Sequence, residues 1–133
     1  MKLSRTISYA LQATLALARN GTGEPIPCSR LAKEGQMPER FLLQILRNLV
    51  NHGILRSTRG VDGGYTLVRN PEDVSLLELI EAIDGPIDSL IPGAESMNEV
   101  SQHRLQDALD SITTTAREQL QAIKLTHLLP PPE

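Results

Sequence analysis

The sequence predicts a mainly α-helical protein that carries one small two-stranded β-hairpin. Only three of its 133 residues are aromatic, so the core must be built mostly from Leu, Ile, Val and Ala, which suits helices better than a large sheet. Apolar residues recur at helical spacing over several segments, and none of the nine prolines interrupts these patterns. A glycine-rich stretch at 59–67 lies among short strand-like runs and marks the hairpin.

The first helix is expected over about 5–19, with Ser4 as its N-cap and Gly21 after its end. Basic residues followed by a run of small residues give this segment some likeness to a secretory signal peptide. Gln12 and Thr14 interrupt the apolar run, however, which favours a helix of the folded domain. No apolar run in the chain approaches the ~18 residues of a membrane span.

Two more helices are expected before the hairpin. The first of them is short, covering about 30–34, and has Ser29 as its N-cap. The longer one begins with Pro38, whose missing N–H costs nothing at the first helical position, and it runs to about Asn51. Its apolar face is expected to comprise Phe41, Leu42, Ile45, Leu46, Leu49 and Val50.

The hairpin is expected to pair strands at 55–58 and 65–68 across a tip at 59–64. Glycines in the tip permit backbone angles that other residues avoid, so the hairpin can project from the body of the domain. A fourth helix follows over 75–84, and a long last helix covers about 99–125.

A short helix, a tight turn, a longer helix and a hairpin form the layout of a winged helix–turn–helix, whose second helix enters the major groove of DNA. The polar side of that helix carries residue types that read bases, since Arg pairs with guanine and Gln or Asn pairs with adenine. Leu43 lies beside this stripe and is a candidate for contact with a thymine methyl group. The candidate DNA-binding residues of this helix are Glu39, Arg40, Gln44, Arg47 and Asn51.

The hairpin adds a second set of candidate DNA contacts. Arg59 at its tip suits the minor groove, because a narrow groove concentrates negative potential. Arg56, Ser57 and Thr58 are candidates for phosphate contacts, which position a protein on DNA without reading its sequence. The glycines and Tyr65 are expected to be structural, with the tyrosine ring packed beneath the hairpin.

The charge distribution favours a polyanion as the partner of the N-terminal half. The net charge of the chain is −3, yet residues 1–69 hold ten Lys or Arg and only four Asp or Glu. Residues 70–133 hold three Lys or Arg and twelve Asp or Glu. This asymmetry indicates that the first half binds a polyanion and that the second half has another role, the alternative being a chance distribution of charge.

The segments FLLQILRNL at 41–49 and GILRSTRGVDGGY at 53–65, together with the first helix, resemble the Rrf2 family of bacterial winged-helix transcription regulators. The resemblance is close over about 1–85 and extends to the rest by architecture. It implies a homodimer bound to a roughly palindromic operator on double-stranded DNA, acting in the cytoplasm. We expect a repressor, although the sequence alone does not separate repression from activation. It also implies a long C-terminal dimerisation helix.

The last helix independently favours a dimer, because one apolar stripe on a long helix needs a partner. The alternative is packing of that stripe onto the chain's own body. The candidate dimer-interface residues are Leu105, Leu109, Ile112, Ala116, Leu120 and Ile123. The predicted organisation is a DNA-binding domain over 1–85, an irregular linker over 86–98, a dimerisation helix over 99–128 and a tail over 129–133.

Many members of the family sense through an iron–sulfur cluster whose ligands include three cysteines between the fourth and last helices. Here the interval 85–104 contains no cysteine, so the usual cluster, which relies on thiolates, is not expected. The three histidines show no metal-ligand spacing, and we expect no metal site and no cofactor. The signal is then a small-molecule effector, a partner protein, or none at all.

Cys28 is the single cysteine, which excludes an internal disulfide and suits a cytosolic protein. It is either a small apolar residue tucked under the helix–turn–helix or a redox sensor, and a sensor thiol needs exposure and a lowered pKa. An enzyme is not expected, since the chain has no nucleophile–base arrangement and no phosphate-binding glycine loop. The more serious rival is a winged-helix protein–protein adaptor, whose binding would respond little to salt.

Overall fold

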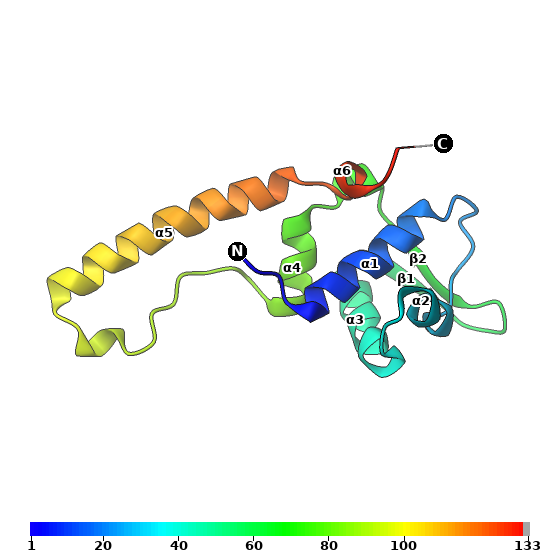
Figure 1. The fold of residues 1–133 in the computed structure, drawn as a ribbon, viewed down its shortest axis with the longest axis horizontal. Helices are drawn as coiled ribbons and strands as arrows, with labels where there is room; N and C mark the ends of the chain where they lie inside the picture. The colour runs from blue at the N-terminus through cyan, green and yellow to red at the C-terminus, as the bar shows by residue number, and fades with distance from the viewer. Residues whose placement is uncertain (132–133) are drawn as a thin grey trace.

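The computed structural model describes residues 1–131, and it confirms a mostly helical fold with one two-stranded antiparallel sheet (Figure 1). Residues 132–133 of the predicted tail lie outside the described residues. A compact head is joined to a long stalk, which projects away from it (Figure 1). The head contains α1 (Arg5–Arg19), α2 (Cys28–Gly35), α3 (Glu39–Asn51), β1 (Leu55–Thr58), β2 (Gly64–Leu67), the 3₁₀ turn η1 (Pro71–Asp73), α4 (Leu76–Asp84) and α6 (Leu125–Leu128), and the stalk contains η2 (Ala94–Ser96) and α5 (Glu99–Ala122).

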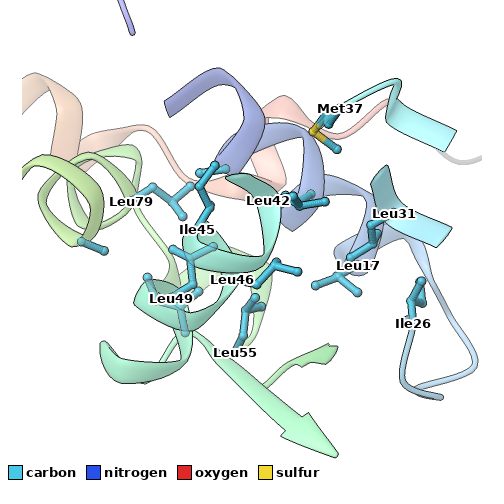
Figure 2. Close-up of a cluster of buried hydrophobic side chains, with 14 of the residues drawn as sticks. Leu17, Ile26, Leu31, Met37, Leu42, Ile45, Leu46, Leu49, Leu55 and Leu79 are labelled. Atoms are coloured by element: carbon cyan, nitrogen blue, oxygen red, sulfur yellow. The ribbon is translucent and has the colours of Figure 1, made fainter. Parts of the chain in front are cut away.

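The core of the head forms around the apolar side of α3. Leu42, Leu46 and Leu49 are fully buried, and Figure 2 shows them among leucines of α1, α2 and α4. Ala10 and Ala13 of α1 are fully buried too, as small side chains that allow close approach to the neighbouring elements. Burying each leucine stabilises the fold by roughly 1.5–3 kcal/mol, which holds α3 firmly with its other side facing solvent.

Phe41 departs from the predicted apolar face of α3, since its side chain is 67% exposed. It precedes Leu42 by one position, which turns it about 100° around the helix axis. The rotation carries Phe41 to the flank of the helix, while Leu42 and Ile45 point into the core. A single large aromatic side chain therefore stands on the surface of the head.

The start of α2 also differs from the prediction. The helix begins at Cys28 and its N-cap is Pro27, whereas Ser29 lies exposed inside the first turn. Pro27 has extended backbone angles and no side-chain cap bond forms, so the backbone of the preceding segment sets the start of this helix. Pro38 is likewise the N-cap of α3, one position before the first helical residue.

The hairpin is attached to the head through a third backbone segment. Thr58 pairs with Gly64, which moves β2 one residue earlier than predicted. The N–H of Ile26 donates to the carbonyl of Tyr65 at 3.0 Å, and the N–H of Tyr65 donates back to Ile26 at 2.9 Å. These two bonds fix β2 on its outer edge, so the hairpin leaves the head in a defined direction.

The stalk begins and ends in the head. The helix α5 stops at Ala122, not at 125 as predicted, because the next residues become extended and pair with the segment before α4. The N–H of Leu76 donates to Ile123 at 2.8 Å, and the N–H of Leu125 donates to Val74 at 3.0 Å. Leu125 is fully buried in the core of the head.

The segment 86–98 leads away from the head to the far end of the stalk, from which α5 returns to the head (Figure 1). The amide of Gln106 donates to the carbonyl of Ser89 at 2.9 Å, and the Ser89 and Thr113 hydroxyls share a hydrogen bond. Arg117 donates to the carbonyl of Ile87 at 3.3 Å. No helix within residues 1–131 has the length and apolar character needed to cross a membrane.

An ion pair between Glu81 and Arg117 joins α4 to α5. The hydrogen bond from Arg117, helped by the backbone N–H of Ile87 at 2.9 Å, lowers the pKa of Glu81. The ionised form is therefore favoured by folding, and its contribution is present above the ordinary carboxyl pKa and is lost as pH falls through the lowered value.

We expect Glu81→Gln to reduce the free energy of unfolding at pH 7 by about 1 kcal/mol or less, because both partners are partly exposed. The difference from the wild type should shrink as pH is lowered below about 4.5, where unfolded Glu81 becomes protonated. Urea denaturation at pH 7, 5 and 3.5 measures this. Glu118→Gln, at an exposed position of α5, is the control. A wild-type advantage that grows with acidity would contradict the assignment.

Candidate nucleic-acid interface

The predicted stripe on α3 faces solvent. Glu39 and Arg40 in the first turn are exposed, as are Gln44, Arg47 and Asn51 further along, opposite the buried leucines. Their positions follow from the helical period, which separates the polar and apolar sides of an amphipathic helix. All five side chains are thus available to a ligand at once, and their role in DNA binding remains a prediction.

The second half of this stripe meets the hairpin across a hollow of about 290 Å³. Arg47 and Asn51 line it from α3, and Ser57 and Arg59 line it from the hairpin. Two arginines, a serine and an asparagine therefore line one concavity, and these residue types suit contacts with phosphates and base edges.

Tyr65 also lines this hollow, in addition to packing against the core. Burial is the main cause of a raised pKa for its phenol. The hydroxyl therefore stays protonated and available as a donor. The position of Tyr65 beside Arg47 could not be inferred from the alternation of side chains along β2, because it depends on how the hairpin packs relative to α3.

Arg56 and Thr58 lie on a different face of the hairpin from Ser57, since side chains alternate along a strand. Arg56 lines a separate hollow with Asn20, Glu24 and Thr66. The structure thus brings Ser57 to the α3 side and leaves Arg56 on the α1 side. The predicted phosphate contacts divide between two faces.

Asn48 was not anticipated as a member of the stripe. It is half-buried, and its side-chain carbonyl accepts a hydrogen bond from the amide of Gln44 at 3.3 Å. Gln44 and Asn48 are four residues apart, so they are neighbours on the helix surface, and this spacing in the sequence could have identified Asn48. The pair orients the Gln44 amide before any ligand arrives.

Cys28 is partly buried at the start of α2, with its sulfur 3.8 Å from the backbone carbonyl oxygen of Glu39. Burial and, second, the charge of Glu39 raise the pKa of the thiol. A raised pKa keeps the sulfur protonated and unreactive, which opposes the predicted redox alternative.

The donor set does not fit a cysteine-ligated cluster. The chain has one thiol, and it lies in the head, far along the sequence from the interval where the family's ligands fall. Among residues 1–131, His, Cys, Asp and Glu side chains form no group of three or more that could hold a metal ion.

The fold separates the predicted dimer-interface residues of α5 into buried and exposed members. Leu120 is wrongly assigned to the interface: the side chain is buried in the chain's own core with Ile7, Leu77 and Ile80. Ile123 lies beyond the end of the helix. Leu109 and Ala116 are half-buried, and the members that remain on the surface are Leu105, which is 36% exposed, and Ile112, which is 64% exposed.

A model of the Rrf2 family, described as iron-dependent transcriptional regulator, matches residues 3–131. An rrf2-like HTH-type transcriptional regulator of Rhodobacter capsulatus is 40% identical over 88 residues, covering 64% of this chain and 59% of its own length. The chain thus spans less than two thirds of that relative. The HTH-type transcriptional regulator IscR of Cereibacter sphaeroides is 32% identical over 108 residues, covering 80% of this chain and 70% of its own.

Solved structures show the same architecture. CymR, the global cysteine regulator of B. subtilis, superimposes with a TM-score of 0.78 at 25% identity. The match covers 96% of this chain and 95% of CymR, so it includes the stalk as well as the head.

Proposed function

Because this chain belongs to the Rrf2 family of transcriptional regulators, we propose that it is a sequence-specific DNA-binding regulator acting as a homodimer. The observation that carries the proposal is the hollow between α3 and the hairpin, where Arg47 and Arg59 converge from separate elements. One guanidinium comes from a helix of major-groove size and the other from a projecting wing. This role would place the protein in the cytoplasm, where its DNA target lies.

In the proposed complex α3 occupies the major groove. Arg40 and Gln44 in its first half and Arg47 and Asn51 in its second half face the base edges. Arg59 enters the adjacent minor groove from the tip of the hairpin. Support comes from the exposure of these side chains and from the net positive charge of residues 1–69.

The proposed dimer forms through α5. Leu105, Ala108 and Ile112 are exposed at spacings of three and four residues, which places them on one side of the helix. At 24 residues α5 is about 36 Å long, enough to hold two heads apart on one operator. A two-fold dimer implies a roughly palindromic operator, and we propose repression by occupation of that site.

Arg59→Ala should weaken operator binding by about 1–3 kcal/mol and relax preference for A·T pairs where the wing lies. The measurement is a fluorescence anisotropy titration at several salt concentrations, on a duplex obtained by selection from random DNA. The slope of log affinity against log salt should also become shallower by about one.

The matched control is Arg104→Ala, which removes an exposed guanidinium from the stalk. It should leave both affinity and slope unchanged. Wild-type affinity in Arg59→Ala would refute the role of the wing. Failure of the wild-type protein to select any duplex would refute the proposed function as a whole.

A further inference from the structure

A second hollow, of about 410 Å³, lies beside the recognition helix between α1, α3 and α4. Its size falls in the lower part of the range of small-molecule sites. Tyr9, Phe41, Ile45 and Ile83 supply apolar walls from all three helices. Phe41 is 67% exposed in this hollow, so its ring has an apolar face available to a ligand.

Two opposite charges line the same hollow, Arg5 from α1 and Asp84 from α4. Both are exposed, and the ion pairs found among the described residues join other partners. Each charge also lies at the unfavourable end of its helix. Arg5 is the first residue of α1, where the helix dipole is positive, and Asp84 is the last residue of α4, where it is negative.

Neither charge therefore contributes to the stability of its own helix, and together they suit a ligand that carries both signs. A carboxylate near Arg5 would be favoured by the guanidinium and by the positive end of α1. An ammonium near Asp84 would be favoured by the carboxylate and by the negative end of α4. The apolar side chain of an amino acid, which leaves the same carbon atom as its two charged groups, would rest against Tyr9 and Phe41.

We propose that this hollow is an effector site for a free amino acid with a large apolar side chain. The occupant is chosen by charge complementarity at the two helix ends and by the apolar walls of the same hollow. The class of ligand is a zwitterion of metabolite size.

The site is coupled to DNA reading through Gln44 and Asn48, which line it while hydrogen-bonded to each other at 3.3 Å. A ligand that contacts either amide changes the orientation of Gln44, a proposed base-reading residue. This coupling rests on the proposed function, whereas binding of the ligand does not.

Binding is tested first without DNA, by calorimetric titration of the full chain with three probes. L-phenylalanine carries both charges, 3-phenylpropanoate lacks the ammonium and 2-phenylethylamine lacks the carboxylate. L-phenylalanine should bind at least about tenfold more tightly than either analogue, because each lacks one charge-assisted contact. Equal binding of an analogue overturns the zwitterion assignment, and no binding of any probe overturns the site.

Variants then locate the site. Arg5→Gln should reduce binding of L-phenylalanine about tenfold and leave binding of 2-phenylethylamine, which has no carboxylate, unchanged. Asp84→Asn should also reduce binding of L-phenylalanine about tenfold and leave binding of 3-phenylpropanoate, which has no ammonium, unchanged. Phe41→Ala should weaken all three probes. The charge-matched controls, Arg104→Gln and Asp107→Asn on the stalk, should bind like the wild type. Wild-type binding in Arg5→Gln and Asp84→Asn overturns the proposal.

The coupling is tested by titrating the selected duplex with and without saturating L-phenylalanine. A shift in affinity of several-fold that disappears in Phe41→Ala supports an effector role. An unchanged affinity overturns the coupling. A wild-type protein that binds the amino acid but no DNA at all overturns the proposed function and leaves the site standing.

Discussion

Replacing Ile112 by glutamate is expected to give a folded monomer that no longer binds a specific operator. Ile112 lies near the middle of α5 and is 64% exposed, although it is apolar. In a two-fold dimer the same surface of each helix faces its copy, so two glutamates would be brought together and removed from water. Each head would then have to bind its half-site alone.

Operator affinity of this variant should fall to the level of non-specific binding, a loss of about a thousandfold or more. Sedimentation equilibrium gives the mass, and anisotropy on the selected duplex at fixed salt gives the affinity. Circular dichroism should be unchanged, because Ile112 makes no part of the described core.

The matched control places the same charge on the other side of the helix. Thr114 is exposed and lies two positions on, which turns it about 200° from Ile112. Thr114→Glu should remain a dimer and keep its operator affinity. A stable dimer for Ile112→Glu would contradict the proposed interface, whatever its affinity for DNA.

Replacing Gly64 by alanine should detach the hairpin from the head. Gly64 has φ of +151°, a region that other residues rarely adopt. A Cβ there would lie 2.4 Å from the carbonyl carbon of Ile26 and 2.5 Å from its oxygen. Ile26 cannot move away easily, since it is buried and bonded to Tyr65 in both directions.

We expect Gly64→Ala to lower the free energy of unfolding by about 3 kcal/mol, from backbone strain together with this clash. The contribution of Arg59 to operator binding should be lost with the position of the hairpin. Gly21→Ala is the control, because no atom lies within 4 Å of its would-be Cβ. Urea denaturation of both variants decides the matter, and a cost below about 0.5 kcal/mol for Gly64→Ala would count against the account.

Helix capping and hydrophobic periodicity correctly predicted the elements whose bounds depend on residues close together in the sequence. The helix α1 has the predicted bounds because the Ser4 hydroxyl accepts from the N–H of Ile7 and caps it. The strand β1 also has its predicted bounds, and the polar stripe of α3 follows from its period. In each case the signal lies within a few residues of its effect.

The errors concern contacts between distant segments. Leu120 and Ile112 belong to the same apolar repeat along α5. Leu120 is buried and Ile112 is exposed only because of how α5 packs against α1 and α4. Phe41 is an error of a different kind, because its rotation of about 100° from Leu42 already places it at the flank of α3. The hollow that joins Arg5 to Asp84 depends on how α1 meets α4, which no pattern along either helix encodes.

The return of residues 123–125 to the head has a consequence for the order in which the protein can fold during its synthesis. The helices α1 to α4 leave the ribosome well before Leu125, whose place in the core is then open to water. The segment around Val74 also lacks the backbone partner that it later gains. The head therefore reaches its final form only after the stalk has been translated, so a chain whose proposed DNA-binding surface is fully folded already carries the surface proposed for pairing with a second copy.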